Sequence, residues 1–148
     1  MAIKIHYVKA LKDNFVWLLI HNNNVIVIDP GEAQPVLNWL SETSYNLVGI
    51  AITHHHFDHI GGILELRQHY PQCTLMAPDH PDISDIDQKP AENKPFHFWK
   101  HQSIFVPGHT ATHVAYYDGT NIFTGDTLFS GGCGRNFECD YVILFESI

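Results

Sequence analysis

The chain has 148 residues, a length typical of one domain, and 45% of them are hydrophobic, which is enough for a buried core. Sixteen acidic residues outnumber eight lysines and arginines, and the formal net charge of −8 argues against nucleic acid or an anionic membrane as a partner. The absence of a signal peptide, of any run near the roughly 20 apolar residues of a membrane span and of Cys-x-x-Cys spacing predicts a cytoplasmic protein.

The N-terminal part of the sequence predicts strands followed by a helix. Apolar or alternating runs indicate strands at 2–8, 15–20 and 25–29, and the asparagines at 22–24 suit a hairpin turn between the last two. Segment 32–42 has apolar residues at helical spacing and a proline in its first turn, where a helix tolerates it. We expect this helix to cover one face of the strands.

The most informative segment is Thr53-His-His-His-Phe-Asp-His-Ile-Gly-Gly62. His54 and His56 are two residues apart, so their imidazoles point to the same side of an extended backbone. Asp58 and His59 follow on the next turn and can face a neighbouring position. A tract that binds metal loosely would be repetitive and would lack the aspartate and the paired glycines. One loop could therefore serve two adjacent metal ions.

The segments on either side of this loop support that interpretation. Apolar residues 47–52 predict a buried strand before it, and the pattern from 63 to 67 predicts a helix after it. A strand end that leads into a helix is where α/β proteins place functional side chains. The alternative for His59 is that it caps the helix, and we expect His55, which points away from its neighbours, to pack or lie at the surface.

The rest of the chain predicts a second sheet. After a short strand at 74–77, segment 78–95 is polar and punctuated by prolines, which favours an exposed loop. The next elements are expected as strands near 96–99, 103–106, 114–117 and 122–124, followed by the start of a helix within 140–147.

Two of these segments supply further metal ligands. A proline and a glycine form a turn that presents His109, and an apolar strand ends in Gly125-Asp126. A carboxylate has two oxygens and can bridge two cations, whereas a neutral imidazole has one free lone pair, so Asp126 is the natural shared ligand. The sequence predicts one metal held by His54, His56, His109 and Asp126, and a second held in part by Asp58, His59 and Asp126.

These motifs, in this order, resemble the metallo-β-lactamase superfamily. The continuation of Gly125-Asp-Thr-Leu-Phe129 into Ser130-Gly-Gly-Cys-Gly-Arg135 is similar to its hydroxyacylglutathione hydrolase (glyoxalase II) branch, as are segments 11–18 and 28–31. The resemblance implies a mixed α/β (α+β) fold, the αββα sandwich, with helices outside two packed sheets.

The resemblance also implies a function. The expected enzyme is a thioester hydrolase that converts S-lactoylglutathione to D-lactate and glutathione in methylglyoxal detoxification. It would be a monomer with two divalent metals, Zn²⁺ or alternatively Fe or Mn. Asp58 and Asp126 are its candidate catalytic residues. Arg135 and Phe137 align with residues that contact glutathione, although a surface salt bridge and packing are their simpler roles.

Departures from the family pattern are equally informative. Family members are longer, with a third histidine for the second metal and a helical glutathione-binding domain beyond the region matched here. We therefore expect residues 1–148 to be a truncated domain whose second metal site lacks one ligand. Asn136 and Cys139 replace the large apolar residue and the glycine usual at those positions.

Two other functions are compatible with these residues. A glutathione persulfide dioxygenase would hold a single iron on His54, His109 and Asp126. The other alternative is an inactive metal-binding remnant of a hydrolase.

Three residues near the motifs keep alternative roles. His113 either supports the ligands or ends a strand, and Asp29 either orients a ligating imidazole or forms a plain turn. Cys133 is expected to pack rather than to act as a nucleophile.

Overall fold

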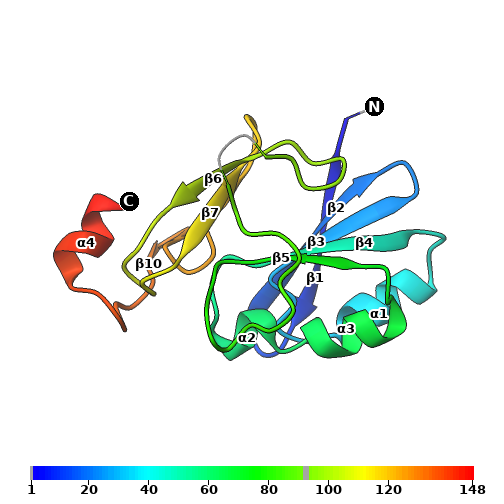
Figure 1. Ribbon diagram of the computed structural model, residues 1–148, viewed down its shortest axis with the longest axis horizontal. Coiled ribbons are helices and arrows are strands. Elements are labelled where there is room, and N and C mark those ends of the chain that lie inside the picture. Colours follow the sequence, from blue (N-terminus) through cyan, green and yellow to red (C-terminus); the bar gives the residue numbers. More distant parts are fainter. Residues whose placement is uncertain (1, 92–93) are drawn as a thin grey trace.

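The computed structural model describes residues 2–91 and 94–148. Its first sheet has the strand order β1-β2-β3-β4-β5 (Figure 1). The first three strands form an antiparallel meander, whereas β4 pairs in parallel with both β3 and β5. The carboxyl ends of β3, β4 and β5 therefore meet at one edge. The strands are β1 (Lys4–Ala10), β2 (Asn14–His21), β3 (Asn24–Ile28), β4 (Asn46–Ala51) and β5 (Thr74–Met76).

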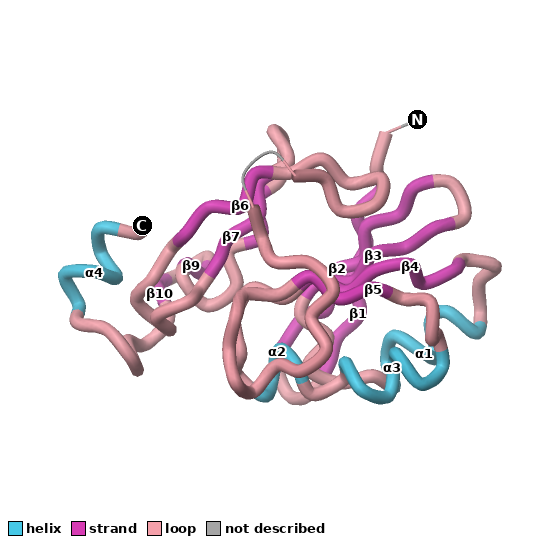
Figure 2. Tube along the Cα trace, viewed as in Figure 1, coloured by secondary structure: helices cyan, strands magenta, loops and turns pink. Residues whose placement is uncertain are grey.

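Two helices cover one face of this sheet. They are α1 (Gln34–Ser41), which has its proline in the first turn, and α3 (Ile63–His69). Their side chains Val36, Leu40 and Leu66 are buried in a cluster with residues from the first sheet. Figure 2 shows the helices on the same side of the strands. Burial of apolar surface against the sheet, at roughly 25 cal/mol per Å², holds these short helices in place.

The second sheet is antiparallel, with the order β6 (Gln102–Phe105), β7 (Val114–Tyr117) and β8 (Ile122–Phe123). A second buried cluster fills the space between the sheets and includes Trp99 and Tyr116. The backbone N–H of Val114 also donates to the Thr53 carbonyl at 2.9 Å. The two sheets are thus joined next to the histidine-rich loop.

The C-terminal part extends away from the second sheet. A small hairpin of β9 (Leu128–Phe129) and β10 (Gly132–Cys133) precedes α4 (Tyr141–Glu146), and Figure 1 shows α4 beyond the end of β6 and β7. The N-cap of α4 is Asp140, whose carboxylate accepts from the Ile143 N–H at 3.1 Å. Large apolar side chains are exposed on the second sheet and on α4, among them Phe105 at 66% and Phe145 at 64%.

The predicted fold class is confirmed, because two sheets pack against each other and helices α1 and α3 cover the outer face of the first. Most predicted strands lie within two residues of the observed ones. The strand expected at 96–99 is wrong: Phe96 and Trp99 exchange backbone hydrogen bonds of 3.0 Å and close a turn that buries both rings. The short helix α2 (Phe57–Ile60), inside the histidine-rich loop, was not predicted.

The loop expected at 78–95 has no helix or strand within its described residues, and positions 92 and 93 lie outside them. It is not wholly exposed, because Ile83 is buried in the first cluster. No helix in the described part of the chain is long and apolar enough to cross a membrane.

A hydrogen bond between the sheets gives a stability prediction. The Tyr116 hydroxyl is buried and donates to the Ile52 carbonyl at 2.6 Å, just before the histidine-rich loop. Tyr116→Phe should lower the free energy of unfolding of the metal-free protein by about 1–3 kcal/mol, because it leaves a buried carbonyl unpaired. Urea denaturation measures this loss. Tyr117→Phe is the matched control, since its more exposed hydroxyl donates to Gly119, and an equal loss in both variants would contradict the prediction.

Candidate metal centre

The candidate centre lies where the carboxyl ends of β3 and β4 meet the turns of the second sheet. His54 and His56 follow β4, and Asp58 and His59 lie on α2. His109 comes from the β6–β7 connection, and Asp126 follows β8. Three segments far apart in sequence therefore contribute to one place.

The first group of ligand atoms comes from His54, His56 and His109. One ring nitrogen of each lies within 4.8 Å of those of the other two. His56 Nδ1 and His109 Nε2 are 2.9 Å apart, close enough for a hydrogen bond between the two rings in the metal-free protein. The sequence predicts these three histidines and Asp126 for the first metal, and this group contains the three histidines.

Hydrogen bonds fix which nitrogen of His54 is free. The Thr53 hydroxyl donates to the Asp29 carboxylate at 2.7 Å, so its oxygen can accept from His54 Nδ1 at 3.0 Å. His54 Nε2 then carries the lone pair, and it is buried without a hydrogen-bond partner. A buried acceptor without a partner is costly, and a cation at this point would satisfy it.

His109 is oriented in the same way by a backbone group. Its Nδ1–H donates to the Arg135 carbonyl at 2.6 Å, which leaves Nε2 free toward His56. Gly134 permits this approach, because a Cβ at this position would collide with the Asp126 carbonyl oxygen and lie 2.8 Å from His109 Nδ1. The loop after Asp126 thus determines the tautomer of His109, which lies in the connection between β6 and β7.

The second group comprises His54, His59 and Asp126, whose ligand atoms also lie within 4.8 Å of one another. His59 Nε2 is 3.1 Å from Asp126 Oδ1 and 3.4 Å from Asp58 Oδ2. The other oxygen of Asp126, Oδ2, lies 3.4 Å from His109 Nε2. Asp126 therefore faces both groups, which is the position expected of a bridging ligand.

The pKa values of His59 and His54 are shifted in opposite directions. Burial lowers the pKa of His59, but the carboxylates of Asp29, Asp126 and Asp58 together outweigh burial and raise it to about 12. Burial, and then the neighbouring imidazoles of His59 and His113, hold the pKa of His54 far below its usual range. The carboxylates thus favour positive charge beside His59, while His54 stays neutral and keeps its lone pair.

These residues fit a divalent metal. The donor set is imidazole nitrogen and carboxylate oxygen, which suits zinc, iron and manganese. His54 Nε2 is buried without a hydrogen-bond partner. The polar atoms beside His59 Nε2 are the carboxylate oxygens of Asp126 and Asp58, at 3.1 and 3.4 Å. The Asp126 carboxylate lies between the two groups, with one oxygen near His59 and the other near His109.

Asp29, His113 and His55 each make specific contacts beside the ligands. The Asp29 carboxylate accepts from His59 Nδ1 at 3.0 Å, so Asp29 orients His59 in addition to Thr53. The His113 ring stacks on His54 with centroids 4.5 Å apart, and its Nε2 accepts from the Asp126 N–H at 3.1 Å. His55 is buried and points to Glu138.

The two predicted substrate-binding residues lie beside the first group. The Phe137 ring is edge-on to His56 and His109, with centroids 5.4 and 5.3 Å away, and 62% of the residue is exposed. Arg135 is exposed and lines the same shallow hollow of about 340 Å³ as His109 and Asp126. A larger hollow of about 630 Å³ is also lined by Asp126, together with Asp58 and residues of β2.

Sequence reasoning missed two supporting residues. Asn14 donates to Asp58 Oδ2 at 3.0 Å, and Glu138 contacts both the His55 ring and the Ala111 N–H. Asn14 belongs to an N-terminal segment that resembled the family, but no spacing rule connects it to residue 58.

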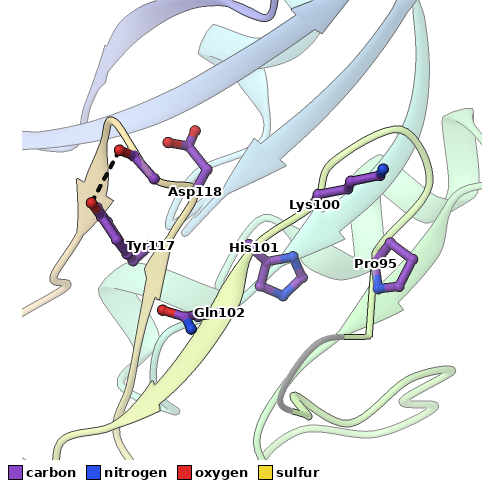
Figure 3. A pocket seen from close by; sticks show the side chains of 7 residues that line it. Pro95, Lys100, His101, Gln102, Tyr117 and Asp118 are labelled. Atoms are coloured by element: carbon purple, nitrogen blue, oxygen red, sulfur yellow. Dashed lines mark hydrogen bonds between the residues drawn. The ribbon is translucent and has the colours of Figure 1, made fainter.

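A separate hollow of about 580 Å³ lies at the far end of the second sheet (Figure 3). The Asp118 carboxylate in its lining already accepts from the backbone N–H groups of Thr120 and Asn121. The His101 ring is stacked on Trp99, with centroids 4.3 Å apart. The described residues around it do not bring several free ligand atoms together, so the metal centre is the better candidate site.

Comparisons with known proteins agree with this geometry. The sequence model of the family described as "Metallo-beta-lactamase superfamily" matches residues 12–85. The "Hydroxyacylglutathione hydrolase" of Photobacterium profundum is 44% identical over 150 residues, which cover 99% of this chain and 59% of that protein. The chain thus spans less than two thirds of the length of this relative.

Solved structures of similar fold include the BLEG-1 B3 metallo-beta-lactamase, with a TM-score of 0.86. It is 20% identical, and the match covers 97% of this chain and 83% of that one. ETHE1 from Myxococcus xanthus has a TM-score of 0.80 at 25% identity, covering 99% of this chain and 68% of that one.

Loss of a ligand shared by both groups should remove metal. His54→Ala and Asp126→Ala should each lower the metal content after dialysis by roughly half or more, since even an outer-shell change costs about 10–100-fold in affinity. The same variants should lose the rise in melting temperature that bound metal gives the wild type. Elemental analysis and thermal denaturation measure the two effects. His69→Ala, an exposed change on α3, is the control, and unchanged metal content in both ligand variants would refute the assignment.

Proposed function

Because the chain belongs to the metallo-β-lactamase superfamily, we propose that it is the metal-binding part of a hydrolase that cleaves hydroxyacylglutathione thioesters. The observation that carries the proposal is the convergence of two ligand groups on Asp126. The proposed substrate is S-lactoylglutathione, and the products are D-lactate and glutathione. The 44% identity to a protein of this name over nearly the whole chain supports the choice of substrate.

The proposed ligands divide between two cations. His54, His56 and His109 would hold the first, and Asp58 and His59 the second, with Asp126 between them. A divalent cation, when bound, acts as a Lewis acid and lowers the pKa of a coordinated water from about 15.7 to about 7. Zinc is the first candidate, and iron and manganese suit the same donors.

The carboxylates would orient the attacking water. Hydrogen bonds from His59 and Asn14 hold the pKa of Asp58 well below its usual range. Burial raises the pKa of Asp126, but the hydrogen bond and the charge of His59, together with the neighbouring His109 ring, outweigh burial and lower it. Both groups are therefore ionised at neutral pH and accept hydrogen bonds. The leaving group is the thiolate of a cysteine-type thiol with a pKa of about 8.5, so it can depart without protonation by a general acid.

The substrate would lie along the hollow beside His109. Arg135 is one of only two arginines in a chain with eight basic residues, and its guanidinium can bind a glutathione carboxylate in a two-pronged contact. The exposed Phe137 ring offers an apolar surface next to the first ligand group. All three cysteines are free, which supports the proposal of a reducing compartment such as the cytoplasm.

Removal of metal tests the proposed hydrolysis directly. The purified 148-residue chain should hydrolyse S-lactoylglutathione, and treatment with a chelator should reduce the rate to that of buffer. Addition of Zn²⁺, Fe²⁺ or Mn²⁺ after removal of the chelator should restore it. Turnover that survives complete loss of metal, measured by elemental analysis, would refute the proposal. A chain that binds two metals without turnover, while a form extended by a helical domain is active, would identify it as the inactive remnant.

The dioxygenase alternative requires a single iron. The second ligand group around His59 favours two cations instead, because three carboxylates surround one imidazole there. Oxygen consumption with glutathione persulfide, measured with the iron-loaded chain, distinguishes the two activities.

Arg135 provides a test of the substrate site. Arg135→Ala should raise KM for S-lactoylglutathione by roughly 10–150-fold, because a charge-assisted contact is worth about 1.5–3 kcal/mol, and should change kcat little. Arg67→Ala is the matched control: that arginine contacts Asp87 and the Asp85 carbonyl, away from the metal centre. Steady-state kinetics that show the same KM in all three proteins would remove Arg135 from the site.

A further inference from the structure

The segment from Gly134 to Glu138 lies against the loop that carries His109. The Arg135 carbonyl accepts from the His109 ring, and the Phe137 N–H donates to the His109 carbonyl at 3.3 Å. These contacts fix the backbone of the segment against one ligand. They also place the Glu138 side chain between the two ligand loops.

Each oxygen of the Glu138 carboxylate contacts a different loop. Oε2 accepts from the Ala111 N–H at 2.7 Å, two residues beyond His109. Oε1 lies 3.1 Å from Nε2 of His55, the residue between His54 and His56. The loop containing His55 follows β4 of the first sheet, and the loop containing Ala111 connects β6 and β7 of the second. One carboxylate therefore connects ligand loops from both sheets.

The His55 ring is fixed on its other side. It stacks on the His80 ring with centroids 3.4 Å apart and planes at 7°. A ring nitrogen binds a cation in the plane of its ring, so two parallel stacked rings cannot direct their lone pairs to one ion. His55 and His80 therefore do not form a metal site together in this arrangement. The stacking instead holds His55 so that its Nε2 faces Glu138.

The spacing of the first ligand group depends on these two loops. His56 Nδ1 and His109 Nε2 are 2.9 Å apart, and they belong to different loops. At the inner side the loops are joined where the Val114 N–H donates to the Thr53 carbonyl. Glu138 joins them at the outer side, where its side chain is 32% exposed.

We propose that Glu138 is a positioning residue that sets the separation of His56 and His109 by connecting the two ligand loops. Its carboxylate lies within 4.8 Å of ring nitrogens of His55 and His56, but its two close contacts are His55 Nε2 and the Ala111 N–H, and it acts through these and not as a metal ligand. The inference rests on the proposed metal centre and adds a residue that determines its geometry.

The experiment compares Glu138→Ala, Glu138→Gln and Glu146→Ala in the 148-residue chain. Glu146 is an exposed glutamate on α4, so its removal makes the same charge change elsewhere. The measurements are the zinc dissociation constant of the first ion by chelator competition, the visible spectrum of the Co²⁺-loaded protein, and the urea stability of the metal-free protein. Zinc and cobalt are the probes, and the readouts are independent of turnover.

Glu138→Ala should weaken zinc binding by roughly 10–100-fold and change the Co²⁺ spectrum, as expected for loss of a residue that orients ligands. Glu138→Gln keeps one acceptor oxygen and should lose less affinity, and Glu146→Ala should match the wild type. In a His55→Ala background the effect of Glu138→Ala should shrink, because one of its two contacts is already absent.

Two results would overturn the inference while the metal centre stands. One is wild-type affinity and an unchanged Co²⁺ spectrum in Glu138→Ala. The other is a decrease in the urea stability of metal-free Glu138→Ala that is large enough to explain the whole decrease in zinc affinity. Glu138 would then stabilise the fold in general and would not set the ligand geometry. A wild-type chain that binds neither Zn²⁺ nor Co²⁺ would instead refute the proposed function, and this inference with it.

Discussion

The buried carboxylate of Asp29 determines which ring nitrogens at the metal centre are free. One oxygen accepts from the Thr53 N–H at 2.8 Å, and the other accepts from both the Thr53 hydroxyl and His59 Nδ1. Through the Thr53 hydroxyl it also orients His54. A single carboxylate therefore orients one histidine in each ligand group, and the Nε2 of each ring is directed toward the other ligand atoms.

The parallel pairing of β3 with β4 makes this arrangement possible. It brings Asp29, directly after β3, beside Thr53, shortly after β4, and the Asp29 N–H donates to the Ala51 carbonyl at 3.0 Å. Asp29 has a φ of 53°, a conformation that aspartate tolerates better than most residues. The geometry of the ligands is therefore a consequence of sheet topology, and the loop sequence by itself does not determine it.

Much of the fold and most of the site could be predicted from local patterns. Ligands such as His54 and His56 lie in a compact motif, and the apolar runs before them have the period and length of strands. The turn at Phe96 and Trp99 could not be predicted in this way, because its two aromatic residues are apolar enough to resemble a strand and tertiary packing buries them. The contacts of Asn14 and Glu138 depend on which segments the fold brings together. Sequence spacing carries no information about such contacts without a topology.

The exposed apolar side chains of the second sheet and α4 have a practical consequence for solution work. Phe105 and Phe145 present hydrocarbon surface to water, and exposed apolar surface favours association between molecules where it forms a contiguous patch. Self-association of folded chains would raise the apparent melting temperature as protein concentration increases, by mass action. Comparisons of variants are therefore meaningful at matched concentrations, and light scattering across a dilution series would show the range in which each molecule behaves independently.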